Sequence, residues 1–422
     1  MKIIQRVIKI TAKGAKDFRK ERKGLKTSDL SFAPLAASLR PLRLVFFITL
    51  FLTHHFGFSQ SAESATLIVC PPSIPKSETA SVKTIAAYIN KHYTTEKEKI
   101  TAIYCWLAHN IAYDVAKAAA LISTSTESYD KEQAVKHTLK VRKGVCQDYA
   151  ELMEALCRQC GIKVYPVYGI VRRQGQIGEA HAWIAAWIDR QWRIYDPTWG
   201  AGYVNDGVFT QQFNSEFYDI SPKDAVKSHL PLDPMWQLLS YPISVESFYR
   251  GDFQENTSRK PFHFSDTIAL FERQDTIQQC YDIMRRIEAG GIYNQATVDY
   301  LDHLNSIIEN DKVDSFNDGV FAFNDAVAAL NDYFNYFNRQ FTPEKSKTEV
   351  VRMLRTAETG IQTAIQRFQS IKNPSPELLR NMNDIASKMK TMSQQLAEHN
   401  RFVEKYFNTD SAQRKMLFWS SN

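Results

Sequence analysis

The chain has 422 residues, of which 44% are hydrophobic and 23% charged. This composition is ordinary for a globular protein with buried cores, and the length allows two or three domains. The formal charge is +6, but residues 1–43 alone hold twelve Lys and Arg against three acidic residues. The rest of the chain is therefore slightly acidic, which removes the main support for nucleic-acid binding. Six cysteines are too few for a disulfide scaffold of this length.

Residues 1–60 are interpreted as a leader. An apolar run at residues 44–58, LVFFITLFLTHHFGF, follows Arg40 and Arg43 and precedes small residues, which is typical of a secretory signal peptide. Its strictly apolar part is about nine residues, too short for a membrane-spanning helix, so an uncleaved anchor is the less favoured alternative. Residues 1–40 resemble neither a domain nor a targeting element and suggest an over-extended start. We predict a secreted or periplasmic protein.

Helices are predicted next in the chain. Apolar residues at helical spacing favour helices over residues 75–92 and 95–113, and Thr95 offers a cap for the second. Residues 115–140 are less regular, with one helical piece at 132–139. Cys70 lacks the small preceding residues of a lipid-attachment site, so we expect an ordinary or paired cysteine.

The helix predicted over residues 146–160 begins with a cysteine. Gly144 and Val145 interrupt the chain just before Cys146, and Gly161 is a suitable stop. A thiol in the first helical turn meets the partial positive charge of the helix N-terminus, which favours the thiolate. Two further cysteines of this helix, Cys157 and Cys160, form a CxxC pattern. Because no second Cys/His pair follows at a suitable spacing, core packing is favoured over a redox pair or a zinc site.

Three strands are predicted at residues 164–172, 180–188 and 192–196. If Asp189 and Arg190 form the loop between the last two, Ile188 pairs with Gln191 and the register of the hairpin is set. His181 and Asp196 then lie diagonally on one face, within reach of a hydrogen bond. A slip of one residue would place them on opposite faces.

The rest of the chain divides at about residue 262. A hairpin is predicted over residues 203–218. The stretch from there to residue 262 is rich in proline, and its segment SHLPLDPMW would suit a wall near a cleft. Residues 263–422 carry apolar residues at alternating spacings of four and three, which predicts an antiparallel bundle of four or five helices. His399 falls in such a seam and is interpreted as a polar core residue. The other isolated histidines, His109, His137 and His229, show no partner signature and are expected to be structural or exposed.

The chemistry proposed from these residues is that of a cysteine nucleophile. Cys146 would attack, His181 would be the base, and Asp196 would orient the imidazole. The backbone N–H of Cys146 is a candidate oxyanion donor, with Gln147 or Trp106 as candidates for a second. The alternative without catalysis is that Cys146 is a buried structural thiol and His181 a hydrogen-bonded residue of its strand.

Residues 95–200 resemble the transglutaminase-like superfamily, which has a papain-like cysteine fold. The resemblance rests on CWLAHNIAYD, RKGVCQDYAELMEALCRQCGI, the histidine of EAHAWI and the aspartate of YDPTWG. It implies an α+β catalytic domain over residues 61–262, in which Cys146 corresponds to the nucleophile, His181 to the base and Asp196 to the orienting carboxylate. The Pro-rich stretch through SHLPLDPMWQ resembles the extension of bacterial envelope members. The helical bundle at 263–422 lies outside this core.

The resemblance implies acyl transfer through a thioester on protein or peptide amides, and a peptidase or amidase is the leading hypothesis. One alternative is a protein-glutamine transglutaminase, in which an amine accepts the acyl group. The other is a non-catalytic peptide-binding or scaffolding protein that acts through the bundle. We expect a protein or peptide substrate, no nucleic acid, no cofactor and no metal, and partner binding or self-association through the bundle.

Overall fold

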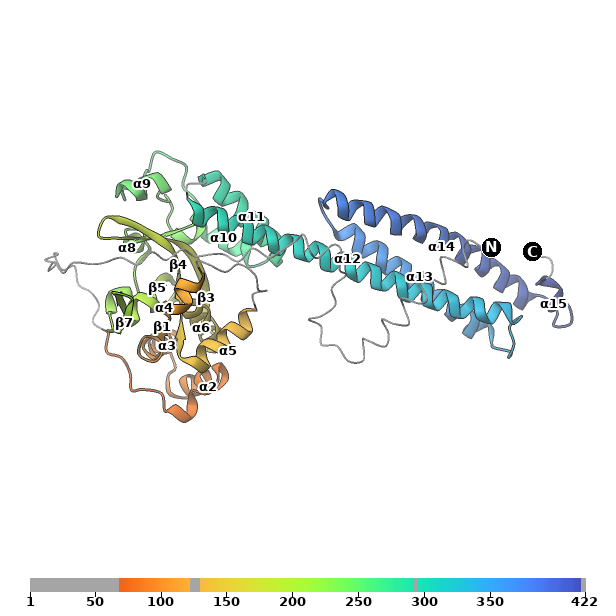
Figure 1. Cartoon of the computed structure of the whole chain (residues 1–422), viewed down its shortest axis with the longest axis horizontal. Coiled ribbons are helices and arrows are strands. Elements are labelled where there is room, and N and C mark those ends of the chain that lie inside the picture. Colours follow the sequence, from red (N-terminus) through yellow and green to blue (C-terminus); the bar gives the residue numbers. More distant parts are fainter. Residues whose placement is uncertain (1–67, 122–129, 292–293, 419–422) are drawn as a thin grey trace. The chain divides into compact units, whose positions relative to one another are not determined.

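The computed structural model describes residues 68–121, 130–291 and 294–418 (Figure 1). The predicted leader at 1–60, with its signal peptide, lies outside these residues. Within the described ranges, every helix is too short or too polar to cross a membrane. The chain divides into two compact units, one reaching to Ile307 and the other beginning at Ile308. The composition changes near residue 262, but the first unit continues 45 residues further.

The helix predicted at residues 95–113 forms as α3 (Glu96–Asn110), whereas the one predicted at 75–92 begins as an α-helix only at Val82, and both are capped at their N-termini. The side chains of Ser81 and Thr95 each accept a hydrogen bond from the backbone N–H of the third residue of the following helix. The side chain of that third residue in turn accepts a hydrogen bond from the backbone N–H of Ser81 or Thr95. Helix α6 packs against strands β3 and β4, and α2, α3 and α5 pack on α6 (Figure 1). The helical elements of this layer are η1 (Lys76–Glu78), α2 (Val82–His92), α3 (Glu96–Asn110), α4 (Val115–Leu121), α5 (Lys131–Val141) and α6 (Cys146–Gln159).

A four-stranded antiparallel sheet, ordered β5-β4-β3-β8, lies at the centre of the unit. Its strands are β3 (Lys163–Arg173), β4 (Gln176–Ile188), β5 (Gln191–Tyr195) and β8 (His229–Pro231). Both faces are buried. Ala182 and Ile184 of β4 join the core shared with the helices, whereas Trp183 and Ala185 join a second core with η3 (Pro234–Gln237) and α10 (Phe264–Phe271). Two hydrophobic cores therefore lie on the two faces of one sheet.

The hairpin between β4 and β5 has the predicted register. Ile188 pairs with Gln191, and Ile184 pairs with Tyr195. Asp189 and Arg190 have φ values of 48° and 65°. Positive φ at both loop residues is the geometry of a two-residue hairpin turn whose twist matches that of the strands.

Smaller elements complete the first unit. β1 (Ala112–Tyr113) and β2 (Lys143–Gly144) pair in parallel, and β6 (Gly202–Asn205) and β7 (Val208–Gln211) form the second predicted hairpin. The remaining helices are α7 (Pro197–Ala201), η2 (Ser215–Phe217), α8 (Pro222–Ala225), α9 (Val245–Arg250) and α11 (Thr276–Gly290), and α12 (Gln295–Asn338) begins here.

A disulfide joins Cys70 to Cys105 across 35 residues, so Cys70 is a paired cysteine. The other cysteines of the described chain, Cys146, Cys157, Cys160 and Cys280, are free and buried. Burial raises the pKa of the Cys160 thiol to about 11. Cys157 and Cys160 are thus core residues, as their position within a helix predicted.

We expect Cys70→Ala to lower the free energy of unfolding by about 2–4 kcal/mol, because the crosslink no longer restricts the unfolded chain. Urea denaturation with and without dithiothreitol checks this. Reductant should lower the midpoint of the wild type and leave that of Cys70→Ala unchanged. A wild-type midpoint that ignores the reductant would contradict the assignment.

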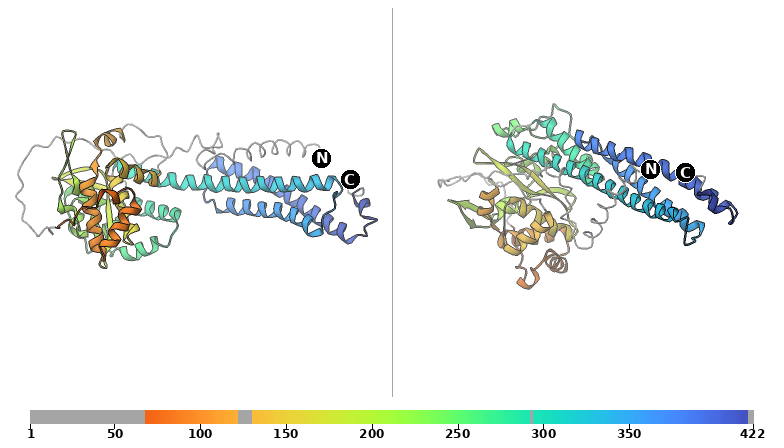
Figure 2. Two further views of the ribbon diagram at one scale, coloured as in Figure 1. Left: turned by 90° about the horizontal axis from the view of Figure 1, so that it is seen from below. Right: turned by 45° about the vertical axis from the view of Figure 1, so that its right-hand side comes forward.

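The second unit is helical. It contains the later part of α12, then α13 (Lys347–Ser370), α14 (Pro376–Asn408) and the short α15 (Arg414–Leu417). Helices α13 and α14 run antiparallel and lie side by side in both views of Figure 2. The residues predicted for the seams form its core, among them Phe323, Leu354, Ile361, Met392 and Leu396. His399 contacts Tyr333 Oη through Nδ1 at 3.2 Å, as a polar residue within this core.

Candidate active site

Cys146 is the first residue of α6, at the end of a tightly built turn. The carboxylate of Asp148 accepts a hydrogen bond from the backbone N–H of Val145 at 2.8 Å and pairs with Lys117 Nζ at 2.6 Å. Gly144 is needed here, since an added Cβ would lie 2.6 Å from Asp148 Cβ. This arrangement fixes the helix start, and the residue Cys146 is 2% exposed. Small reagents should therefore reach its thiol more easily than bulky ones.

His181 lies in β4 between Cys146 and Asp196. Its Nε2 is 2.8 Å from Asp196 Oδ2. Because Nε2 is engaged by Asp196, Nδ1 is the nitrogen that remains for the Cys146 thiol. Burial works to lower the pKa of His181, but the charge and hydrogen bond of Asp196, together with the nearby Cys146 thiol, outweigh it, so that the pKa lies above its ordinary value.

Asp196 follows β5 and caps α7. Its Oδ1 accepts hydrogen bonds from the backbone N–H groups of Thr198 and Trp199 at 2.9 and 3.1 Å. Its Oδ2 accepts from His181 and, at 3.2 Å, from His229 Nε2. Although burial acts to raise the pKa of this carboxyl, the charge of His181 and these bonds hold it well below its usual range. Because its pKa is lowered, Asp196 is an ionised carboxylate. Its side chain is 0% exposed, so all four of its hydrogen-bond partners lie inside the protein.

His229 shows no partner signature in the sequence and was expected to be structural or exposed, and the structure places it, buried, against Asp196. It is 1% exposed and contacts the same carboxylate oxygen as His181. The contact spans 33 residues and links β8 to the residue that follows β5, at the opposite edge of the sheet, so no local spacing could reveal it. The one available signal was its place in SHLPLDPMW, which the sequence suggested as a wall near the cleft. The other two isolated histidines are exposed, as expected.

The proposed oxyanion donors differ in their surroundings. The backbone N–H of Cys146 is one of the free N–H groups at the start of α6. The side-chain amide of Gln147 donates to Glu151 at 3.0 Å. The indole of Trp106 lies under the Arg142 guanidinium at 4.8 Å, and its buried Nε1 has no hydrogen-bond partner within the described residues. Their role in catalysis stays a prediction.

Aromatic rings surround the histidines. The Trp199 ring lies 5.2 Å from that of His181 and 4.8 Å from that of His229. Trp199 also lines a cavity of about 280 Å³ together with Arg173, whose guanidinium lies 5.9 Å from the indole. The cavity therefore shares Trp199 as a wall with the site.

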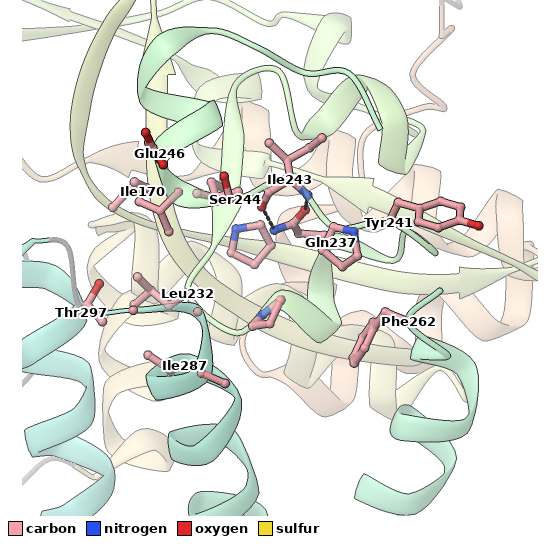
Figure 3. Close-up of a pocket in the computed structure, with 18 of the residues that line it drawn as sticks. Ile170, Leu232, Gln237, Tyr241, Ile243, Ser244, Glu246, Phe262, Ile287 and Thr297 are labelled. Carbon is pink, nitrogen blue, oxygen red and sulfur yellow. Dashed lines mark hydrogen bonds between the residues drawn. The ribbon is translucent and has the colours of Figure 1, made fainter. Parts of the chain in front are cut away.

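A second cavity, of about 440 Å³, lies beside β8 (Figure 3). Leu230 and Pro231 line it together with residues of the Pro-rich extension and of α11. Gln237 bonds both the N–H and the C=O of Ile243, at 2.7 and 2.9 Å, and so fixes one wall (Figure 3). Among the described residues that line this cavity, none belongs to the Cys146–His181–Asp196 group.

A metal ion is an alternative explanation for part of this cluster. His181 Nε2, Asp196 Oδ2 and His229 Nε2 lie within 4.8 Å of one another and are suitable zinc ligands. However, the separations of 2.8 and 3.2 Å are those of hydrogen bonds in which each imidazole donates to the carboxylate. Hydrogen bonding explains the cluster, and we expect a chelator to leave the reactivity of Cys146 unchanged.

The close approach of β4, β3 and β8 depends on Gly169. This residue pairs with His181 on one side and with Pro231 on the other. A β-bulge between Ile170 and Arg172 follows at once, where β3 pairs with both neighbours. A Cβ at position 169 would lie 2.3 Å from both Leu230 O and Trp183 Cη2.

We expect Gly169→Ala to lower the free energy of unfolding by about 1–3 kcal/mol through overpacking. The matched control is Gly290→Ala, because an added Cβ there meets nothing within 4 Å. Urea denaturation of both variants checks the expectation. Equal stability of Gly169→Ala and the control would refute this role of Gly169.

Comparisons with known proteins find relatives of the core of this unit. Residues 83–197 match the family model of the transglutaminase-like superfamily. Human kyphoscoliosis peptidase is 33% identical over 173 residues, 38% of this chain and 25% of that protein, and the mouse protein matches equally. Lim and transglutaminase domain protein ltd-1 of Caenorhabditis elegans is 24% identical over 126 residues, 25% of this chain and 17% of that protein.

Among solved structures, the periplasmic domain of TgpA from Pseudomonas aeruginosa is similar at 22% identity and a TM-score of 0.23, covering 30% of this chain and 45% of that one. The chain spans a quarter of the length of the kyphoscoliosis peptidases that it matches. The α+β core with its helix, strand and strand contexts was the architecture expected from the sequence. Residues 83–197 of this chain form a domain of the transglutaminase-like superfamily.

Proposed function

We propose that the domain is a cysteine-dependent acyl-transfer enzyme that acts on amide bonds of proteins or peptides. Cys146 is the nucleophile, His181 the base and Asp196 the orienting carboxylate. The observation that carries the proposal is that the buried imidazole of His181 bonds the Asp196 carboxylate through Nε2 and lies close to the Cys146 thiol. A structural thiol does not need this arrangement.

The reaction follows from the positions of the protons. His181 takes the proton of the Cys146 thiol, and Sγ attacks the carbonyl carbon of the amide. The tetrahedral intermediate collapses as the C–N bond breaks, and the imidazolium of His181 gives its proton to the departing amine. The acyl group is then a thioester on Cys146. A water activated by His181 attacks it, and the acid and the free thiol are released.

Hydrolysis is the favoured outcome over transfer to an amine. A cross-linking enzyme must keep water from its thioester, which requires a specific barrier at the site. The human and mouse relatives are named peptidases, which also supports hydrolysis. An amine acceptor remains the second outcome of the test below.

An oxidising compartment suits this protein. The disulfide between Cys70 and Cys105 would be reduced in most cytosols and persists in secreted or periplasmic proteins. It supports the location proposed from the apolar run at residues 44–58. Association through the helical bundle stays a prediction, since its apolar seam residues are used in its own core.

The test compares wild type with Cys146→Ala on a mixture of unfolded proteins, with and without a labelled primary amine. We expect mass spectrometry to find new chain termini that depend on Cys146. Amine-labelled glutamines instead of new termini would identify a transglutaminase. Neither product, from a protein whose Cys146 reacts with iodoacetamide, would favour the peptide-binding alternative. Cys280→Ala, which removes a free thiol elsewhere in the unit, should behave as wild type.

A further inference from the structure

His229 stands out as a buried polar group that the three-residue mechanism does not use. It begins β8 and pairs with Val171 of β3. Its ring lies 4.9 Å from that of Trp183 and 4.8 Å from that of Trp199. Both nitrogens have partners, since Nε2 contacts Asp196 Oδ2 at 3.2 Å and Nδ1 contacts Ser228 Oγ at 2.7 Å. An imidazole so enclosed is part of a built site.

The protonation of His229 follows from its partners. Asp196 is an ionised carboxylate and can only accept, so His229 Nε2 must carry the hydrogen. Burial lowers the pKa of His229 and outweighs its bond to Asp196, so the ring is neutral and Nδ1 is unprotonated. The hydroxyl of Ser228 then donates to Nδ1. The chain of donors therefore runs from Ser228 through His229 to Asp196.

The hydrogen bond from His229 helps to hold the Asp196 carboxylate in place. Two backbone N–H groups hold Oδ1, and the two histidines hold Oδ2 from different strands. Without His229, Oδ2 would keep only one partner and the carboxylate could tilt about its Oδ1 anchor. A tilt moves Oδ2 away from His181 Nε2, and a misplacement of about 1 Å near reacting groups can cost about 100-fold in rate.

We propose that His229 is a positioning residue that fixes Asp196, so that the site is a Cys146–His181–Asp196–His229 tetrad. The inference rests on the proposed function of the first three residues. His229 has no nitrogen left for a substrate, so it acts through Asp196 alone. The Pro-rich extension that carries it is then part of the catalytic machinery.

The test uses the rate at which iodoacetamide alkylates Cys146 at pH 6, which requires no known substrate. The full chain is compared with His229→Leu, which has no donor, and His229→Gln, whose amide can place a donor near the position of Nε2. We expect a 10- to 100-fold lower rate for His229→Leu. For His229→Gln the rate should stay within about threefold of wild type, because the bond to Asp196 is kept. His137→Leu, at an exposed histidine, is the matched control.

Several results would overturn the proposal. A wild-type rate in His229→Leu would show that Asp196 needs no second histidine. Equal losses in both variants, with equal losses of stability in urea, would leave only a structural role. An increase in the wild-type rate on addition of EDTA would reveal a metal at these atoms. A wild-type Cys146 that is itself unreactive at pH 6 would instead refute the proposed function, and the tetrad with it.

A measurement on the wild type covers the case in which His229→Leu does not fold. Nitrogen-15 chemical shifts distinguish the two neutral tautomers of histidine. We expect the His229 ring to carry its hydrogen on Nε2 and to titrate only below the ordinary histidine value of 6.5. A hydrogen on Nδ1, or a titration near the ordinary value of 6.5, would contradict the donor chain.

Discussion

Asp196→Asn is expected to lower kcat/KM for amide hydrolysis by about 10³- to 10⁴-fold while the chain stays folded, as an equivalent change does in Ser-His-Asp enzymes. The amide can keep its oxygen on the N–H groups of Thr198 and Trp199, which places its NH₂ toward the two histidines. His181 Nε2 would then have to accept a hydrogen bond, and the ring hydrogen would move to Nδ1. That nitrogen faces Cys146 and could no longer take the thiol proton.

The control for this change is Asp206→Asn, at an exposed turn between β6 and β7. The rates are measured on a peptide identified by the cleavage experiment above. A loss of less than tenfold in Asp196→Asn would show that His181 does not depend on the carboxylate for its tautomer.

Asp196→Ala is expected to lower the free energy of unfolding by about 3–5 kcal/mol, because it breaks a buried ionic group and leaves its partners unpaired. The affected donors are two backbone N–H groups and the ring N–H groups of His181 and His229. Helix α7 also loses its cap. Urea denaturation at constant pH measures the loss, and a loss below about 1 kcal/mol would mean that water replaces the carboxylate.

The difference in the free energy of unfolding between wild type and Asp196→Ala should depend on pH in a defined way. The pKa of Asp196 is lowered in the folded chain, so its contribution is present above the ordinary carboxyl value of 3.8 and is lost as the pH falls below it. The pKa of His181 is raised, so its contribution is complete below 6.5 and declines as the pH rises beyond that value. The stability gap between wild type and Asp196→Ala should therefore be widest between these two values. A gap that widens steadily toward alkaline pH would contradict the ion pair.

The parts of the site that sequence could predict are those set by local rules. A two-residue loop at Asp189 and Arg190 fixes the register of one hairpin, and that register brings His181 to Asp196. Gly144 and the helical spacing after Cys146 mark the start of α6. Each of these signals lies within about twenty residues of the atoms that it positions. Turn residues and side-chain periodicity are therefore enough to predict these parts of the site.

The parts that sequence could not predict depend on contacts between distant segments. His229 reaches Asp196 only because β8 adds to the far side of β3, an arrangement that no alternation pattern encodes. The pairing of Cys70 with Cys105 needs η1, α2 and α3 to be folded against each other. Gly169 lies inside the strand predicted at residues 164–172, and only the packed structure shows that Trp183 and Leu230 occupy the space of its missing side chain.

If His181 takes the thiol proton of Cys146, the alkylation of Cys146 by iodoacetamide at pH 6 must depend on His181. Cys146→Ala supplies the background from the other thiols, and His181→Ala supplies the reference without a base. We expect wild-type Cys146 to react at pH 6 about 100-fold or more faster than Cys146 of His181→Ala, because the variant has no imidazole to take the thiol proton. Equal rates for wild type and His181→Ala at pH 6 would contradict the role of His181 as the base.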